Sequence, residues 1–147
     1  MASSDDVKSF EYDSDPSHFR VPAPVLSDIL LVNPLLPDLR TQVVGLLDSG
    51  ADGTIIDPRL VIRLRLAQVD EDLISVATDD GDAEDRSVPV YSVRIVYENI
   101  LDEVIRISSL PRLAEDDVLI GRDILNNLFL ELWGPAKLGY IGLSPRQ

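Results

Sequence analysis

The stretch LLDSGADGTIID (residues 46–57) places a carboxylate at the end of an apolar run and follows it with a loop that contains glycine. The run before it, QVVGLL (42–47), is rich in branched aliphatic residues and predicts a buried strand. Asp48 then stands at a strand end, where a carboxylate needs hydrogen-bond donors around it. Ser49 offers a hydroxyl that braces the loop, while Gly50 allows close backbone approach to the carboxylate. Taken alone, Asp-Ser-Gly is also common in ordinary turns.

A second motif, VLIGRDIL (118–125), lies about 70 residues downstream and combines an apolar strand, a glycine turn and the start of a short helix. In this order and spacing, the two segments resemble the active-site signature of retropepsin-like aspartic proteases. The ending LFLELWGPAKLGYIGL (128–143) resembles the closing strands of bacterial single-domain members, and the whole resemblance covers roughly residues 25–143. It implies an all-β fold, a closed acid-protease (retropepsin-like) β-barrel with one or two short helices. Gly121 and Asp123 are implied to shape the turn and cap the helix.

The chain has one Asp-Ser-Gly, whereas a complete site of this family needs two such loops. The resemblance therefore implies a homodimer whose active site forms at the subunit interface, with Asp48 from each chain as the catalytic residue. Two adjacent carboxylates share one proton, so the ionised one activates a water and the protonated one donates to the peptide carbonyl. The implied function is an aspartic endopeptidase that hydrolyses extended, largely apolar peptides without a metal or other cofactor.

The resemblance also assigns roles to the residues around the catalytic carboxylate. Ser49 and Gly50 are implied to support the active site, the first through a hydroxyl bond across the dimer and the second through an N–H aimed at the carboxylate. The small Ala51 keeps the space above the loop open, and Ala51 and Asp52 are implied to bind substrate. Arg122 is implied to be the ion-pair partner of Asp52, in a structural role.

The predicted hairpin over residues 76–91 matches the flap that this family folds over its substrate. Its tip, DDGDAED (79–85), is acidic and holds one glycine, whereas a flap is usually glycine-rich and fairly apolar. Two interpretations stay open, a flap that contacts substrate through Asp80 and Gly81, or a solvated loop. A working flap of this charge would disfavour acidic substrates. The loop fails as an EF-hand calcium site because, counted from Asp80, the position that needs glycine holds Asp85.

The balance of charged and reactive residues narrows the chemistry further. The 147 residues carry 26 acidic and 13 basic side chains, a formal net charge of −13, which argues against binding nucleic acid or an anionic membrane surface. Cysteine is absent and His18 is the single histidine, which excludes thiolate chemistry and a multi-histidine metal site within one chain. Acid–base chemistry is left to carboxylates. The expected partners are a second copy of the chain and a peptide or protein substrate.

The organisation along the chain suggests one domain after a tail. Residues 1–20 are poor in apolar side chains and rich in Ser and Asp, so we expect a mobile acidic tail followed by the protease domain over 21–147. Asp57 followed by Pro58 predicts a helix start, although VIRLRL (61–66) also suits an exposed strand. No signal peptide or transmembrane segment is seen, so a cytoplasmic location is expected. The alternative function is a non-catalytic dimeric module that keeps the fold and binds peptides.

Overall fold

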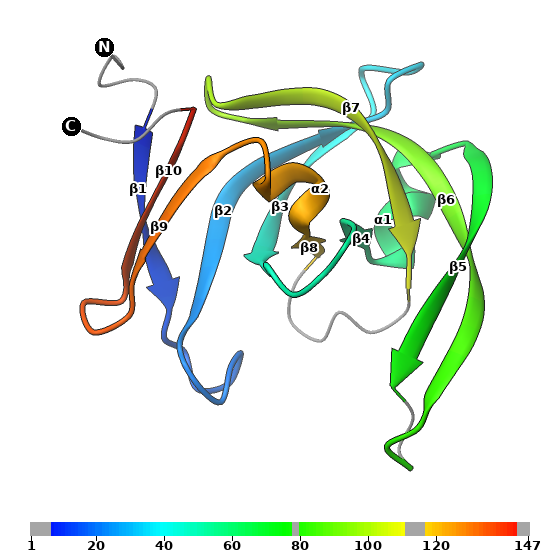
Figure 1. Ribbon diagram of the computed structural model, residues 1–147. Coiled ribbons are helices and arrows are strands. Elements are labelled where there is room, and N and C mark those ends of the chain that lie inside the picture. Colours follow the sequence, from blue (N-terminus) through cyan, green and yellow to red (C-terminus); the bar gives the residue numbers. More distant parts are fainter. Residues whose placement is uncertain (1–6, 78–79, 111–116, 144–147) are drawn as a thin grey trace.

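Six strands of the chain close into a barrel (Figure 1). The computed structural model describes residues 7–77, 80–110 and 117–143. In ladder order the barrel strands are β2 (Ala23–Val32), β3 (Arg40–Leu47), β8 (Val118–Ile120), β4 (Ile55–Ile56), β7 (Leu101–Ser109) and β6 (Ala83–Tyr97). Strand β6 pairs with β2 as well as β7, and this additional pairing closes the ring. The prediction of an all-β closed barrel is confirmed.

The barrel interior is filled by branched aliphatic side chains on alternate positions of the strands. Ile29, Leu31 and Ile95 are fully buried, as expected for the inward face of strands with period two. Gly45 lets β3 pass close to its neighbours, since a Cβ there would lie 2.5 Å from Ile29 Cδ1 and 2.8 Å from Ile120 Cδ1. The close approach packs β2, β3 and β8 tightly at the end of the barrel that leads into the Asp48 loop.

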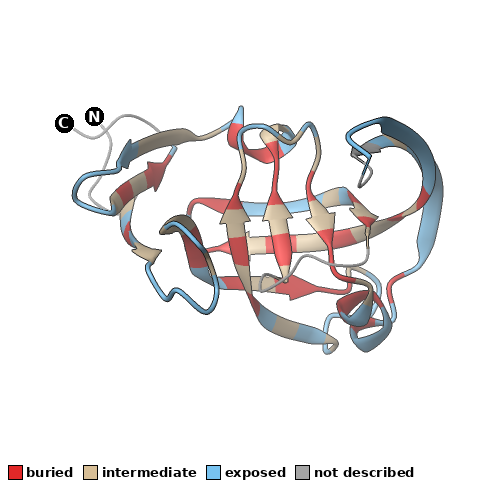
Figure 2. Ribbon diagram, turned by 90° about the horizontal axis from the view of Figure 1, so that it is seen from below, coloured by how far each residue is buried: buried red, intermediate tan, exposed pale blue. Residues whose placement is uncertain are grey.

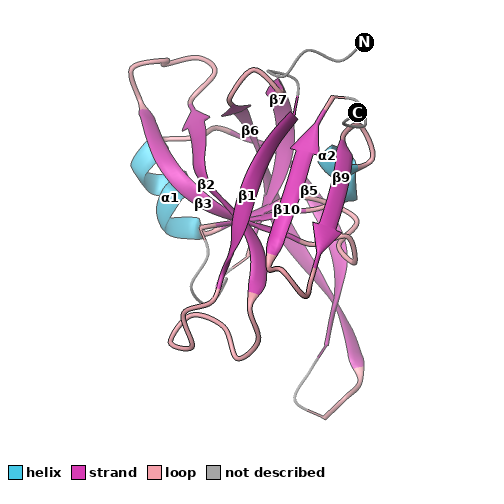
Figure 3. Ribbon diagram, turned by 90° about the vertical axis from the view of Figure 1, so that its left-hand side faces the viewer, coloured by secondary structure: helices cyan, strands magenta, loops and turns pink. Residues whose placement is uncertain are grey.

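A second group of strands extends the sheet beyond β2. Strand β1 (Val7–Asp13) pairs with β10 (Leu138–Gly142), and β10 pairs in turn with β9 (Phe129–Trp133), as Figure 3 shows. Phe10 of β1 is buried against the backbone of Gly139, where a Cβ would lie 2.2 Å from the ring. The structure differs here from the expected tail, because residues 7–13 are part of the sheet. Their ladder partners lie at the other end of the sequence, which local composition does not reveal.

Two short helices complete the described fold, as predicted. Helix α1 (Pro58–Leu64) begins at Asp57, whose side chain accepts a hydrogen bond from the Arg59 N–H at 2.8 Å, and it ends at Arg65 in a left-handed conformation. Its Leu60, Val61 and Leu64 are buried, which settles this segment as a helix rather than an exposed strand. Helix α2 (Arg122–Leu125) directly follows β8. Within the described parts of the chain, no helix is long and apolar enough to cross a membrane.

The predicted hairpin is present as a long arm made by β5 (Gln68–Ala77) and the first half of β6. The ladder between β6 and β7 ends at Val90, and the next residue outward on β6 is Pro89, which has no N–H to donate. Beyond this point the arm has two strands only. Residues 83–87 are all exposed, and Figure 2 shows the arm projecting from the body as a largely pale blue ribbon.

Candidate active site

Asp48 directly follows strand β3 and lies at one end of the barrel, beside the end of β8. Leu47 is paired with Ile120 in a parallel ladder, and the Asp48 N–H donates to the Ile120 carbonyl at 2.9 Å. The chain then leaves β3 as a loop that runs to β4 (Figure 1). Because both flanking strands belong to the barrel, the core fixes the backbone position of Asp48.

The loop itself holds the Asp48 carboxylate in place. The Gly50 N–H donates to Asp48 Oδ1 at 2.8 Å, and the Ala51 N–H donates to the Asp48 carbonyl at 3.2 Å. A Cβ at Gly50 would lie 3.1 Å from the same Oδ1, so glycine keeps this approach open. Asp48 is half-buried, and Ser49 and Gly50 are exposed. The carboxylate is therefore oriented by backbone and still accessible from outside the chain.

The segment after β8 packs directly on this loop. The N–H groups of Arg122 and Asp123 donate to the carbonyls of Ala51 and Asp52 at 2.9 and 3.3 Å. Gly121 touches loop backbone so closely that a Cβ would lie 2.5 Å from the Gly53 carbonyl oxygen. The two motifs expected from the sequence are thus in backbone contact.

The Arg122 side chain adds a second link to the loop. Its Nη1 donates to the Ser49 carbonyl at 2.9 Å, and its Nη2 forms an ion pair with the Asp52 carboxylate. The resemblance had implied this pair. The Asp52 side chain is 94% exposed, so the pair lies at the surface and contributes little to folding. The Asp52 side chain is consequently accessible to other molecules, even while it is paired with Arg122.

Thr54 was not singled out from the sequence, although it connects the two motifs. It is 2% exposed, and its hydroxyl donates to Asp123 Oδ1 at 2.8 Å and accepts from the Gly121 N–H at 3.2 Å. The Thr54 N–H donates to Asp123 Oδ2 at 3.2 Å. Asp123 therefore binds Thr54, while the N-cap position of α2 is occupied by Gly121, which makes no side-chain cap. The signal available in the sequence was the polar Thr54 directly before the apolar Ile55 and Ile56.

A charged cluster secures the far end of the loop. The Arg59 side chain donates to the buried Asp57 carboxylate at 3.0 Å through both Nε and Nη2, and this hydrogen bonding lowers the pKa of Asp57. The Asp57 N–H donates to the Asp117 carbonyl at 3.0 Å, and Asp117 Oδ2 accepts from the Val44 N–H at 3.1 Å. The cluster ties the start of α1 to β3 and to the residue before β8.

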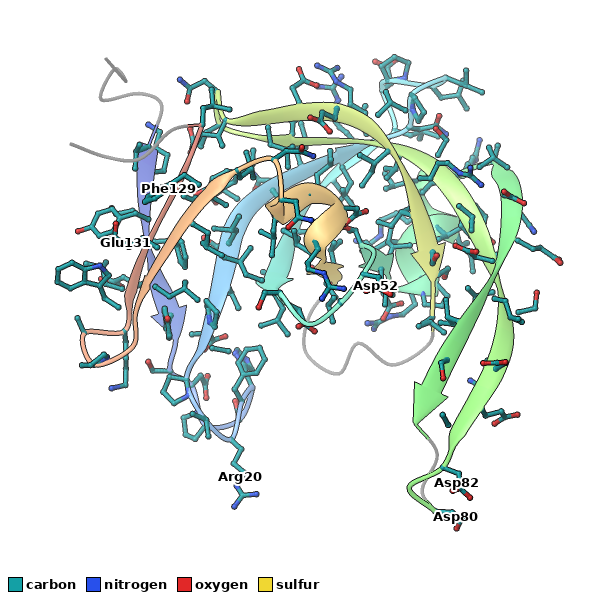
Figure 4. All side chains as sticks on the ribbon, in the orientation of Figure 1. Arg20, Asp52, Asp80, Asp82, Phe129 and Glu131 are labelled. Carbon is teal, nitrogen blue, oxygen red and sulfur yellow. The ribbon has the colours of Figure 1, made fainter. Side chains whose placement is uncertain are left out.

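The predicted flap residues lie apart from this site in the single chain. Figure 4 shows Asp80 and Asp82 at the far end of the arm, away from Asp52. Gly81 turns the chain there with φ 81°, a conformation that favours glycine. Two surface hollows lie along β1, and neither is lined by a residue of the Asp48 loop. The loop after β3 thus presents one carboxylate that its own backbone orients, Asp48, at an open surface.

The barrel, the single Asp-Ser-Gly loop and the Gly-Arg-Asp segment packed on it define an aspartic protease of retropepsin-like fold. The family described as gag-polyprotein putative aspartyl protease matches residues 40–127. This range contains β3, the loop that carries Asp48, β4, β8 and α2. The chain belongs to this family, so it is classed as an aspartic-type hydrolase. The predicted resemblance is confirmed.

A solved bacterial structure of similar shape supports the same fold. A retropepsin-like aspartic protease from Rickettsia conorii has a TM-score of 0.55 and 14% identity, with 92% of this chain and 90% of that chain covered. EIAV protease complexed with the inhibitor HBY-793 has a TM-score of 0.47 and 21% identity, with 71% and 86% covered. The comparison with curated proteins gave no match.

Proposed function

We propose that this chain is a homodimeric aspartic endopeptidase in which Asp48 of each subunit contributes one catalytic carboxylate. The observation that carries the proposal is the single Asp-Ser-Gly loop, which presents one backbone-oriented carboxylate at an open surface. Peptide hydrolysis by carboxylates requires a general base and a general acid together. A two-fold symmetric dimer supplies both from the same residue.

The chemistry follows from placing two carboxylates about 3 Å apart, where they share one proton. The ionised Asp48 removes a proton from a water, and the resulting hydroxide forms a bond to the carbonyl carbon of the peptide. The protonated Asp48 donates its proton to the carbonyl oxygen. As the C–N bond breaks, the Asp48 that took the water proton gives it to the leaving nitrogen. The other Asp48 takes back a hydroxyl proton as the product carboxyl group forms, which restores the shared proton of the pair. The two acid constants belong to the pair, so the dependence of rate on pH is bell-shaped.

The decisive experiment compares the unmodified chain with Asp48→Asn on a peptide library between mildly acidic and neutral pH. A matched control is Asp38→Asn, which changes an exposed aspartate in the loop between β2 and β3 and leaves the Asp48 loop intact. We expect Asp48→Asn to abolish hydrolysis and the control to retain it. Equal activity of Asp48→Asn and the unmodified chain would refute the proposal, and mass measured in solution tests the dimer.

Asp52 and Ala51 are proposed to bind the substrate backbone beside the dyad, while Ser49 and Gly50 support the loop. Since the Asp52 side chain is almost fully exposed, Asp52→Asn should leave the unfolding free energy nearly unchanged while raising KM. A change in stability as large as the change in KM would instead assign Asp52 a purely structural role. Circular dichroism melts alongside initial rates separate the two.

The acidic arm is proposed to act as the flap and to favour basic or neutral peptides over acidic ones. Its Glu84 and Asp85 are exposed, as are Asp80 and Asp82 at the tip. Enrichment of acidic residues around the scissile bonds of cleaved library peptides would contradict this. The same exposure also supports the second candidate, a dimeric module that binds peptides without cleaving them. Binding without cleavage by the unmodified chain would favour that function.

Dimer formation must overcome like charge, because each subunit has a formal net charge of −13. Salt screens repulsion between exposed charges over a Debye length of about 10 Å at 0.1 M. We therefore expect the dimer dissociation constant to fall as salt is added, as measured by sedimentation. A constant that rises with salt would show that attractive ion pairs dominate the interface.

A further inference from the structure

Three exposed aliphatic side chains lie on α1 and on the loop between β2 and β3. Leu35 and Leu36 are 78% and 50% exposed, and Ile62 of α1 is 77% exposed. The loop sequence NPLLPD (33–38) places a proline on each side of the two leucines, which restricts the backbone there. Grouped apolar exposure of this kind marks interaction sites more often than single exposed residues do.

Asn33 fixes the loop and the helix end as one surface. Its side chain is buried, and its Nδ2 donates to the carbonyls of Leu64 and Arg65 at 2.8 and 3.1 Å. Its Oδ1 accepts from the N–H groups of Leu35 and Leu36 at 2.9 and 3.0 Å. One side chain therefore holds the tip of the loop beside the last turn of α1. The surface is formed in advance and loses little entropy when it binds a partner.

Arginines lie in the same segments as these aliphatic side chains, with Arg63 in α1, Arg65 at its C-terminal cap and Arg40 at the start of β3. Arg63 and Arg65 are exposed and form no ion pair among the described residues, and the Arg40 Nε donates to the Pro37 carbonyl at the foot of the same loop at 2.9 Å. The single acid within the loop is Asp38. A chain with twice as many acids as bases therefore carries a local excess of positive charge here. We call Leu35, Leu36, Arg40, Ile62, Arg63 and Arg65 the arginine–leucine surface.

The arginine–leucine surface lies far from the catalytic carboxylate. Arg40 begins β3 and Asp48 follows its last residue, so the two are separated by about 26 Å at roughly 3.3 Å per residue. Figure 1 shows the loop between β2 and β3 at the opposite end of β3 from the loop that carries Asp48. A molecule bound here would leave the active site open.

We propose that the arginine–leucine surface is a docking site for an acidic segment of a partner protein that also carries aliphatic side chains. The carboxylates of the segment would pair with Arg63, Arg65 and Arg40, and its aliphatic side chains would cover Leu35 and Ile62. The two segments that form this surface, residues 33–40 and 62–65, hold three arginines and one acid, Asp38. A narrow acidic segment would meet mainly positive charge there, because exposed charges farther away than a Debye length of about 8 Å are largely screened. A flat anionic membrane would instead face the acidic remainder of the chain.

The test uses full-length Asp48→Asn chain, so that no probe is cleaved and failure of the proposed catalysis does not affect the result. The probes are two short fluorescent peptides with the same leucines, one with glutamates and one with lysines between them. Fluorescence anisotropy should show tighter binding of the glutamate peptide, weakened by salt. Since burying one leucine contributes about 1.5–3 kcal/mol, Leu35→Ser should weaken binding roughly tenfold or more. Arg63→Glu should weaken it as well.

Matched controls are Val104→Ser, at a side chain that is 60% exposed on β7, and Arg20→Glu, at another exposed arginine. Both should leave binding unchanged, and thermal melts should show all four variants folded. Equal affinity for the two peptides, or equal loss in the controls, would overturn the proposal. Anionic vesicles bound through Leu35 would overturn it in favour of a membrane. Assembly beyond a dimer that is lost in Arg63→Glu would assign the surface to a second copy.

Discussion

Replacing Gly121 by alanine tests whether close backbone contact holds the loop that carries Asp48. A Cβ there would lie 2.5 Å from the Gly53 carbonyl oxygen, 2.6 Å from its carbon and 3.0 Å from the Ala51 carbonyl oxygen. All three atoms are backbone atoms of the loop that follows Asp48, so no side-chain rotation relieves the contact. Either the loop or the end of β8 has to move.

The cost of that movement follows from packing and hydrogen bonding. Overpacking at a rigid site costs about 1–3 kcal/mol. The Gly121 N–H also donates to the Thr54 hydroxyl at 3.2 Å, and the Arg122 N–H to the Ala51 carbonyl at 2.9 Å. Adding the loss of one such bond, we expect the unfolding free energy to fall by about 3 kcal/mol. This corresponds to a decrease in Tm of roughly 6–12 °C.

The assay is urea and thermal unfolding at one fixed protomer concentration, because dimer dissociation contributes to the apparent stability. Gly53→Ala and Gly134→Ala are matched controls, since a Cβ at either position meets no atom within 4 Å. Both should stay within about 0.5 kcal/mol of the unmodified chain. Hydrolysis by Gly121→Ala should fall roughly 100-fold, because a shift of about 1 Å misplaces Asp48. A Gly121→Ala chain as stable and active as the controls would refute the reasoning.

Three other substitutions probe the supports of the fold and the loop by urea unfolding. Asn33→Ala should cost about 2–4 kcal/mol because it leaves buried backbone groups unpaired, and a cost below that of a surface substitution would contradict this. Thr54→Val keeps the side-chain shape but removes the hydroxyl bond to Asp123, so we expect a loss of about 1–3 kcal/mol; an unchanged midpoint would count against it. Hydrogen bonds from the Arg59 side chain lower the pKa of Asp57 in the folded chain. The ionised Asp57 therefore stabilises the fold above its unfolded pKa of about 3.9, and this stabilisation is lost as the pH falls through the lower pKa of the folded chain. Asp57→Asn should therefore be less stable than the unmodified chain near neutral pH and approach it in acid, and a constant difference would be inconsistent with this.

Much of the fold was predictable from local sequence, because local chemistry determines it. The branched aliphatic run QVVGLL (42–47) predicted the buried strand β3, and Asp57 followed by Pro58 predicted the start of α1. The two motifs were recognisable through their resemblance to the retropepsin-like signature. The structure shows why each holds a glycine, since a Cβ at Gly50 would approach the Asp48 carboxylate and one at Gly121 would meet loop backbone.

The features that were missed depend on partners far away in the sequence. Strand β1 exists because Val7–Asp13 pairs with residues near the C-terminal end, and its polar composition hides the buried ring of Phe10. The hydrogen bonds between Thr54 and Asp123 join residues 69 positions apart. Neither residue is unusual where it stands, so the network becomes visible only when the barrel brings the two loops together.

The same long-range contacts explain how the loop that carries Asp48 is ordered within one chain. Asp48 is placed by the pairing of β3 with β8, while its loop is held by backbone contact with Gly121 and by the bonds of Thr54. Each of these supports connects segments about 70 residues apart and lies within one chain. The carboxylate is therefore positioned before any partner arrives. In the proposed dimer, association then brings together two loops that are already ordered, so no free energy of loop folding has to be supplied by the interface.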